Sequence, residues 1–134
     1  MKIYSRKFFI SPIQPDNFAM SPNGNIYFPE KYFSEDFSKN DFYDQAWFVH
    51  EVMHIYQYQK ENQWMTLKGF FLGMGRFFGF NPYKYKIDFS KNISDYNMEQ
   101  QGDIARDYFL IKKGLKKVSQ KEFDWYQKNI LSLR

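Results

Sequence analysis

The feature that most constrains this chain is the segment His50-Glu51-Val52-Met53-His54, which has the pattern H-E-x-x-H. It contains both histidines of the 134-residue sequence. On an α-helix, positions four residues apart lie on one face, so His50 and His54 can bind the same metal ion. Glu51 lies about 100° around the helix, where it can reach a water molecule on that ion. This arrangement is typical of zinc hydrolases.

The residues around the motif predict a buried helix. A helix that is apolar on nearly all sides is buried, and titratable side chains in such a helix need a partner, often a metal. The alternative is a chance motif on a surface helix with a solvated Glu51, but the helical context favours the metal site. The apolar residues form two stripes, which are Phe42, Ala46, Val49, Met53 and Tyr56, and Phe48, Val52 and Ile55.

Composition limits how a metal could be held. The chain has no cysteine, which excludes a disulfide framework, a thiolate metal site and a thiol nucleophile. The remaining ligands are histidine and carboxylate, which are typical of catalytic zinc sites. The length predicts one domain covering residues 1–134.

Charge and hydropathy give weaker constraints. The net charge is +4, and its densest point is the two lysine pairs at 112–113 and 116–117. A solvated helix end explains these lysines better than an anionic partner, so we predict no specific nucleic-acid partner. The first residues do not have the pattern of a signal peptide, so we expect none, and no apolar run is long enough to span a bilayer. We therefore expect a soluble protein, made in the cytoplasm, that would need a specialised route for export.

The remaining elements are predicted from local patterns. Short β-prone runs at 3–4 and 7–10, and a turn at 21–25 before residues 26–28, predict a small N-terminal hairpin or sheet. The motif helix should begin near Asn40 or Asp41 and end between Gln59 and Glu61. Residues 83–89 alternate as a strand or an extended loop. A helix over 98–113 should stop at Gly114, and a capping box at 119–122 should open a last helix.

The Gly/Phe-rich segment 69–80 has two interpretations. It is either a short helix packed on the core or a mobile aromatic flap over the cleft. Core packing is favoured, because exposing so many phenylalanines promotes aggregation. Together these elements predict a helix-rich α+β fold with the motif helix at its centre.

A catalytic zinc site normally has three protein ligands, and here the third must be a carboxylate. Glu99 and Asp103 lie four residues apart, on one face of the second long helix. We predict that Glu99 binds the metal and that Asp103 accepts the second ring N–H of a liganding histidine. A solvated acidic helix start is the alternative.

Taken together, the pattern His-Glu-x-x-His followed downstream by Glu-x-x-x-Asp resembles that of the gluzincin metallopeptidases. The blocks 47–57, 96–101 and 107–109 are similar to short metallopeptidase domains associated with Rhs and Vgr proteins of the type VI secretion system. The resemblance covers residues 25–110 and implies a zincin-like fold with one Zn²⁺ per chain, and a toxin or effector delivered by a spike protein. It also implies a protein or peptide substrate, while an immunity protein is a further expected partner.

The implied mechanism assigns Glu51 as the base that takes a proton from water and passes it to the leaving amine. An additional donor must stabilise the oxyanion, and Tyr96, Arg106 and Tyr108 are the candidates, each with a structural role as the alternative. Gln57 either lines the cleft or caps a polar face. A competing function is a catalytically silent binding module that keeps zinc for stability and uses the aromatic segment 69–80 as its contact surface.

Overall fold

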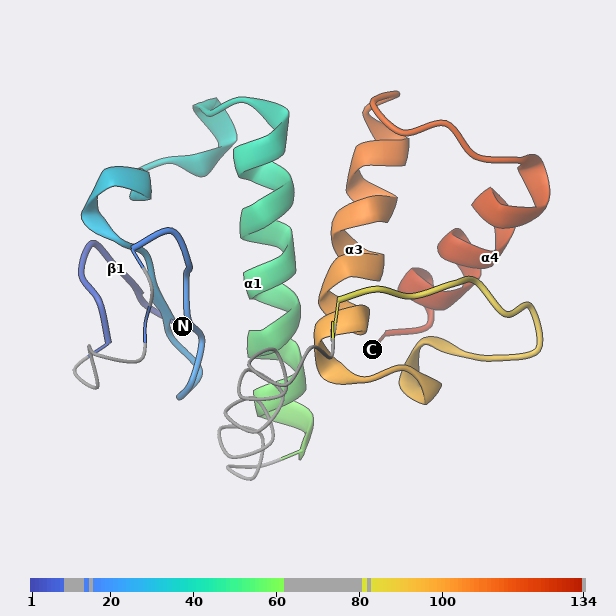
Figure 1. Ribbon diagram of the computed structural model, residues 1–134, viewed down its shortest axis with the longest axis horizontal. Coiled ribbons are helices and arrows are strands. Elements are labelled where there is room, and N and C mark those ends of the chain that lie inside the picture. The colour runs from blue at the N-terminus through green and yellow to red at the C-terminus, as the bar shows by residue number, and fades with distance from the viewer. Residues whose placement is uncertain (9–13, 15, 62–80, 82, 134) are drawn as a thin grey trace.

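The computed structural model describes residues 1–8, 14, 16–61, 81 and 83–133. Its long helices are α1 (Phe42–Glu61), α3 (Met98–Lys112) and α4 (Gln120–Leu131). Among the described residues, the strands are β1 (Ile3–Tyr4) and β2 (Ile26–Tyr27). Short 3₁₀ helices lie between the longer elements, namely η1 (Glu30–Tyr32), η2 (Phe37–Lys39) and η4 (Ile93–Asp95). The predicted helix-rich α+β architecture is confirmed. Figure 1 shows α1 in the middle, with the N-terminal segments on one side and α3 and α4 on the other.

The motif helix α1 begins where the sequence predicted. The Asp41 carboxylate accepts hydrogen bonds of 2.9 Å from the backbone N–H groups of Tyr43 and Asp44. It thereby satisfies two of the N–H groups that a helix start leaves without intrahelical partners. The predicted start is therefore confirmed. The helix is described as far as Glu61, and the residues that follow it lie outside the described part of the chain.

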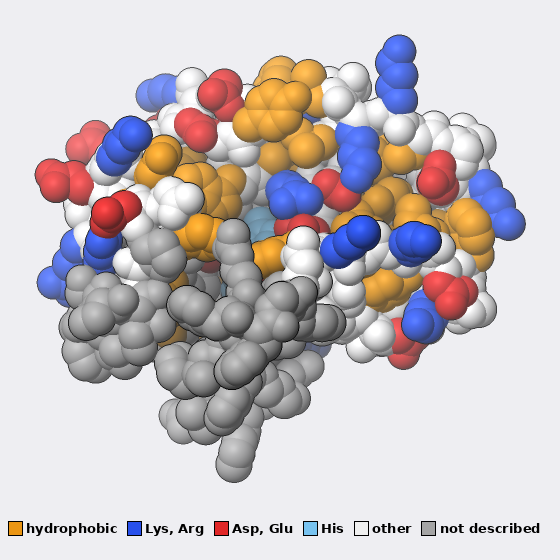
Figure 2. Space-filling model, in the orientation of Figure 1, with side chains coloured by type: hydrophobic (Ala, Val, Ile, Leu, Met, Phe, Trp, Pro, Cys, Tyr) orange, Lys and Arg blue, Asp and Glu red, His pale blue; other side chains and the backbone are white. Residues whose placement is uncertain are grey.

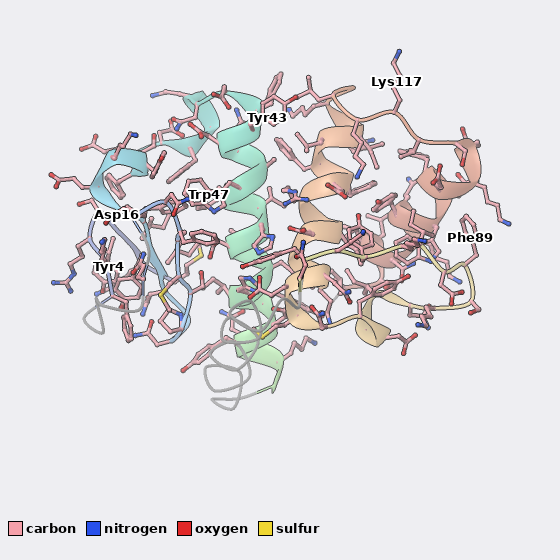
Figure 3. The ribbon with its side chains drawn as sticks, viewed as in Figure 1. Tyr4, Asp16, Tyr43, Trp47, Phe89 and Lys117 are labelled. Atoms are coloured by element: carbon pink, nitrogen blue, oxygen red, sulfur yellow. The ribbon has the colours of Figure 1, made fainter. Side chains whose placement is uncertain are left out.

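The two apolar stripes of α1 pack against different cores, which explains why the helix is apolar on nearly all sides. Met53 joins the cluster formed with α3 and α4, whereas Ile55 joins the cluster with Phe28 and Phe37 from the N-terminal segments. Trp47 also points toward this N-terminal side (Figure 3) and contacts the Phe28 ring at 5.2 Å. One member of the predicted stripes was wrong. Phe42 is 43% exposed, because it lies at the first position of the helix.

The small sheet differs from a simple hairpin. The turn before β2 is present, with Gly24 at φ +75°, and Met20 pairs with Tyr27 as an isolated antiparallel bridge. The strand beside β2 in the sheet is β1, however, and this pairing is parallel, with Ile3 opposite Ile26. The alternation of apolar and polar residues predicts which face of a strand is buried, but it does not predict which segment pairs with that strand. Of the predicted run 7–10, Lys7 and Phe8 are not in a strand, and the other two lie outside the described residues.

The second half of the chain follows the predicted signals. Asn97 and Ser119 each accept a hydrogen bond in the first turn of α3 and α4, within a complete capping box. Gly114, at φ +74°, follows the end of α3. Within the described residues, 83–89 contain no strand: Tyr83 and Phe89 lie in turns, and residues 84–88 are neither helix nor strand. The segment 69–80 lies outside the described residues. No helix among the described residues combines the length and the apolar character that crossing a membrane requires.

Candidate metal centre

Three predicted side chains converge between α1 and α3. His50 and His54 come from successive turns of α1, and Glu99 comes from the first turn of α3. They form a group whose ligand atoms lie close enough to hold one metal ion. All three are largely shielded from solvent, with side-chain exposures of 9%, 10% and 15%.

The spacing of the ligand atoms suits a small tetrahedral cation. Glu99 Oε2 lies 3.4 Å from Nε2 of both histidines, and the two Nε2 atoms are 3.0 Å apart. Ligands bound to zinc at about 2.0–2.1 Å and at tetrahedral angles lie about 3.3 Å from one another. Acceptor atoms this close repel each other unless a proton or a metal ion lies among them. The donor set therefore fits zinc, or another divalent ion with the same preferences.

Each histidine has a partner at its other ring nitrogen. His54 Nδ1 lies 2.9 Å from Gln57 Oε1, an acceptor, so Nδ1 carries the hydrogen and Nε2 is left to bind a cation. Gln57 is itself fixed, because its amide donates to Met98 O and to Gln101 Oε1 on α3. The structure thus places Gln57 beside a metal-group histidine, where it orients the ring.

Asp103 holds the second histidine. Its Oδ1 lies 2.9 Å from His50 Nδ1 and 2.7 Å from Arg106 Nη1, and its side chain is 6% exposed. A carboxylate in this position keeps the hydrogen of His50 on Nδ1 and turns Nε2 toward Glu99. The predicted pair of carboxylates four residues apart is therefore brought to the same histidine by one face of α3.

The electrostatics of the group favour positive charge. Burial on its own lowers the pKa of His50, but hydrogen bonds to Asp103 and Glu99 outweigh it and raise the pKa to about 9. The pKa of His54 is also raised, since Glu99 outweighs burial. Burial on its own raises the pKa of Glu99, whereas its hydrogen bonds to both histidines hold the pKa far below the usual range. The site therefore attracts a cation.

Glu51 lies beside this group with a partner from the N-terminal segment. Its residue is 5% exposed, and its negative charge contributes to the raised pKa values of His50 and His54. The Ser21 hydroxyl donates a 2.7 Å hydrogen bond to Glu51 Oε2. The motif carboxylate is thus buried near the histidines and held from a distant part of the chain.

The three candidate oxyanion donors lie in different surroundings. The Tyr96 hydroxyl donates to Lys86 O and accepts from the Asp88 N–H, within the core. Tyr108 packs against Phe123. Arg106 reaches the metal group indirectly, through Asp103, and it also pairs with Asp107. A catalytic contact for any of these residues stays a prediction.

Three residues near the site were missed by the sequence analysis. Gly102 lies against the His50 ring, and a Cβ at this position would come within 2.6 Å of it. Its signal was a glycine on a helix, three residues after Glu99 and so on the same face. The Tyr83 ring lies 6.3 Å from the His50 ring. Neither Tyr83 nor Ser21 has a local sequence signal, because both reach the site by chain folding.

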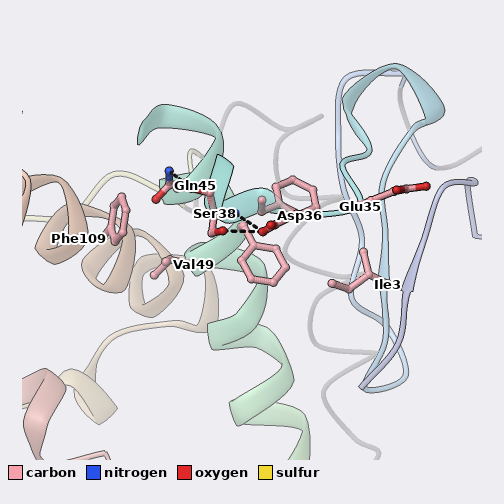
Figure 4. Close-up of a pocket in the computed structure, with 9 residues that line it drawn as sticks. Ile3, Glu35, Asp36, Ser38, Gln45, Val49 and Phe109 are labelled. Carbon is pink, nitrogen blue, oxygen red and sulfur yellow. Dashed lines mark hydrogen bonds between the residues drawn. The ribbon is translucent and has the colours of Figure 1, made fainter. Parts of the chain in front are cut away.

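The candidate metal centre is separate from a cavity in the described structure. In Figure 2 a histidine side chain is visible near the middle of the face, where hydrophobic, basic and acidic side chains meet. A cavity of about 370 Å³ lies elsewhere along α1, between η2, β1 and α3 (Figure 4), and none of the metal-group residues lines it. It is lined by Ile3, Glu35, Asp36, Phe37, Ser38, Gln45, Phe48, Val49 and Phe109.

The fold and the site define a helix-rich α+β domain with a His–His–Glu group suited to a metal ion between two packed helices. No protein-family model matches the chain. Comparison with known proteins finds similarity to the type VI secretion system spike protein VgrG2b of Pseudomonas aeruginosa, with 39% identity over 102 residues. That match covers 75% of this chain and 10% of the spike protein, so the chain spans about a tenth of the length of its relative.

The solved effector domain of Pseudomonas aeruginosa VgrG2b is similar over nearly the whole chain. The TM-score is 0.73 at 28% sequence identity, and the match covers 98% of this chain and 69% of that domain. The sequence and structure matches point to the same protein. The chain is therefore homologous to the effector domain of VgrG2b.

Proposed function

We propose that this chain is a single zincin-like domain that hydrolyses peptide bonds as a zinc metallopeptidase. The observation that carries the proposal is the convergence of His50, His54 and Glu99 within 3.0–3.4 Å of one another, with Glu51 buried beside them. Two histidines and a glutamate are the ligand set of catalytic zinc sites that keep one position open. A structural zinc site built from cysteines is excluded, because the sequence contains no cysteine.

In this proposal each side chain has a defined task. His50, His54 and Glu99 would hold zinc, which is a Lewis acid that lowers the pKa of water and polarises a carbonyl group. Asp103 and Gln57 keep the two rings oriented through Nδ1. The Glu51 carboxylate takes a proton from the attacking water and hands it to the leaving amine. The scissile C–N bond breaks, and the products are a carboxylate and an amine.

The first experiment measures metal content and hydrolysis together. The wild-type protein should bind about one zinc per chain by elemental mass spectrometry and cleave fluorescein-labelled casein. Glu99→Ala should lose the zinc, whereas Glu51→Gln should keep it and lose hydrolysis by at least about 10²-fold. Equal hydrolysis by Glu51→Gln and wild type would overturn the peptidase proposal. A wild-type protein that binds zinc but does not cleave casein would fit the catalytically silent binding module instead.

We also propose that the chain acts as an effector of type VI secretion, delivered by a spike protein. The homology to the effector domain of VgrG2b supports this role. Inducible expression in a bacterial host tests it, because an effector that acts by hydrolysis should arrest growth as wild type and not as Glu51→Gln. Growth arrest of equal strength by both variants would contradict the link between toxicity and hydrolysis.

A further inference from the structure

Ser21 joins the N-terminal segment to the motif carboxylate. Its hydroxyl donates a 2.7 Å hydrogen bond to Glu51 Oε2, although the two residues are 30 positions apart. Glu51 is 5% exposed. A hydrogen bond to a charged acceptor is about twice as strong as a neutral one, and its strength grows where water is excluded. The hydroxyl therefore restricts how the carboxylate can turn about its side-chain bonds.

The position of Ser21 does not depend on this hydrogen bond. The preceding residue, Met20, exchanges two backbone hydrogen bonds of 3.1 and 2.9 Å with Tyr27 on β2. On the other side of the turn, Gly24 packs so closely on the Tyr58 ring of α1 that a Cβ would lie 2.9 Å from it. Because these contacts fix the segment on both sides, loss of the Ser21 hydroxyl should leave the backbone in place.

We propose that Ser21 is a positioning residue for the proposed hydrolysis: its hydroxyl holds Oε2 of Glu51 and so leaves Oε1 as the oxygen that exchanges the proton. This inference rests on the proposed function, because it assigns Glu51 as the base. The two acceptor oxygens of a carboxylate lie in one planar group, so holding one of them limits where the other can lie. Preorganisation of this kind acts on the chemical step more than on substrate binding.

The test compares Ser21→Ala with Ser21→Thr, which keeps a hydroxyl. Ser34→Ala is a matched control, because the Ser34 hydroxyl makes a side-chain hydrogen bond of 2.8 Å to Asn40, away from the metal group. Zinc content is measured first. The affinity of acetohydroxamate for the zinc-loaded protein, by calorimetry, is the readout that needs no activity, since this chelator carries N–H and O–H groups that can donate to a carboxylate beside the metal. Hydrolysis of labelled casein then gives kcat and KM.

We expect Ser21→Ala to keep its zinc, to bind acetohydroxamate about tenfold more weakly and to lose about tenfold in kcat with KM unchanged. Ser21→Thr should stay within about threefold of wild type, and Ser34→Ala should not change. If Ser21→Ala bound acetohydroxamate with the same affinity as wild type, the inference would be overturned. A Ser21→Thr variant as impaired as Ser21→Ala would also overturn it, since the hydroxyl would then not be the cause.

The variant Glu51→Gln separates the inference from the proposed function. If Glu51→Gln binds acetohydroxamate more weakly than wild type while Ser21→Ala is unaffected, the positioning role of Ser21 fails and the role of Glu51 as the base stands. If Glu51→Gln binds the chelator like wild type and hydrolysis does not depend on Glu51, the proposed function fails, and the role of Ser21 in it fails as well.

Discussion

Replacing Gly102 with alanine tests the geometry of the candidate metal centre at its closest contact. A Cβ at this position would lie 2.6 Å from His50 Cε1 and 2.8 Å from both ring nitrogens. Moving the ring to an ordinary contact of 3.4 Å requires a shift of 0.8 Å. The ring has little room for this shift, since Asp103 holds its Nδ1 and the residue is 7% exposed.

Two opposing contributions decide the size of the effect. Glycine to alanine in the middle of a helix stabilises it by about 1 kcal/mol, whereas overpacking a core costs about 1–3 kcal/mol. The free energy of unfolding of the metal-free protein should therefore fall by about 0–2 kcal/mol. Zinc affinity should fall much further, because metal–ligand distances tolerate only about 0.2 Å. We expect a loss of about 100-fold, the upper range for changes that reorient a ligand.

The assay is a competition titration with a zinc chelator, together with urea denaturation of the metal-free protein. Gly114→Ala is the control, since Gly114 has φ +74° and its new Cβ would meet no atom of the described residues within 4 Å. It should lose about 1–2 kcal/mol from backbone strain and bind zinc like wild type. If Gly102→Ala bound zinc with wild-type affinity and gained about 1 kcal/mol in stability, the close approach of α3 to His50 would be refuted.

Three further predictions follow from the same contacts. Gln57→Ala removes the acceptor at His54 Nδ1, so zinc affinity should fall about 10–100-fold in the same titration while the fold persists by circular dichroism. Because the pKa of His50 is raised to about 9, a proton competes with zinc for this residue below that pH. The apparent zinc affinity should therefore rise from about pH 6 to pH 9. Calorimetry in buffers of different ionisation enthalpy should detect the protons that are released when zinc binds. Asp107→Ala removes an acceptor 2.5 Å from the Tyr85 hydroxyl, and it should lower the free energy of unfolding by about 2–3 kcal/mol in urea without changing zinc content.

Much of the candidate site was accessible from the sequence because its rules are local. The four-residue spacing of His50 and His54 fixes their common face once the helix is known, and the absence of cysteine leaves a carboxylate as the third ligand. The same spacing places Asp103 one turn after Glu99, and the structure brings both to His50. Cap residues likewise determined where the helices begin.

The features that the sequence did not reveal depend on contacts between distant segments. The parallel pairing of β1 with β2 brings together residues more than twenty positions apart, and the alternation pattern does not encode that partner. The bond from Ser21 to Glu51 spans 30 positions. Serine is common next to turns, so its presence in the sequence did not indicate a role at the site. Only the packing of the turn on α1 brings the Ser21 hydroxyl to Glu51.

The polar character of the interface between α1 and α3 bears on why a metal would bind there. Elsewhere the two helices join a hydrophobic core that includes Met53 and Ile104. At the metal group this packing is replaced by two histidines and the buried carboxylates of Glu99 and Asp103. Burying such charges usually stabilises a fold less than apolar side chains of similar volume would. Apolar side chains at this interface would stabilise the fold more, so stability alone does not explain these polar residues. Binding of a cation explains them better, and the proposed hydrolysis requires such a cation.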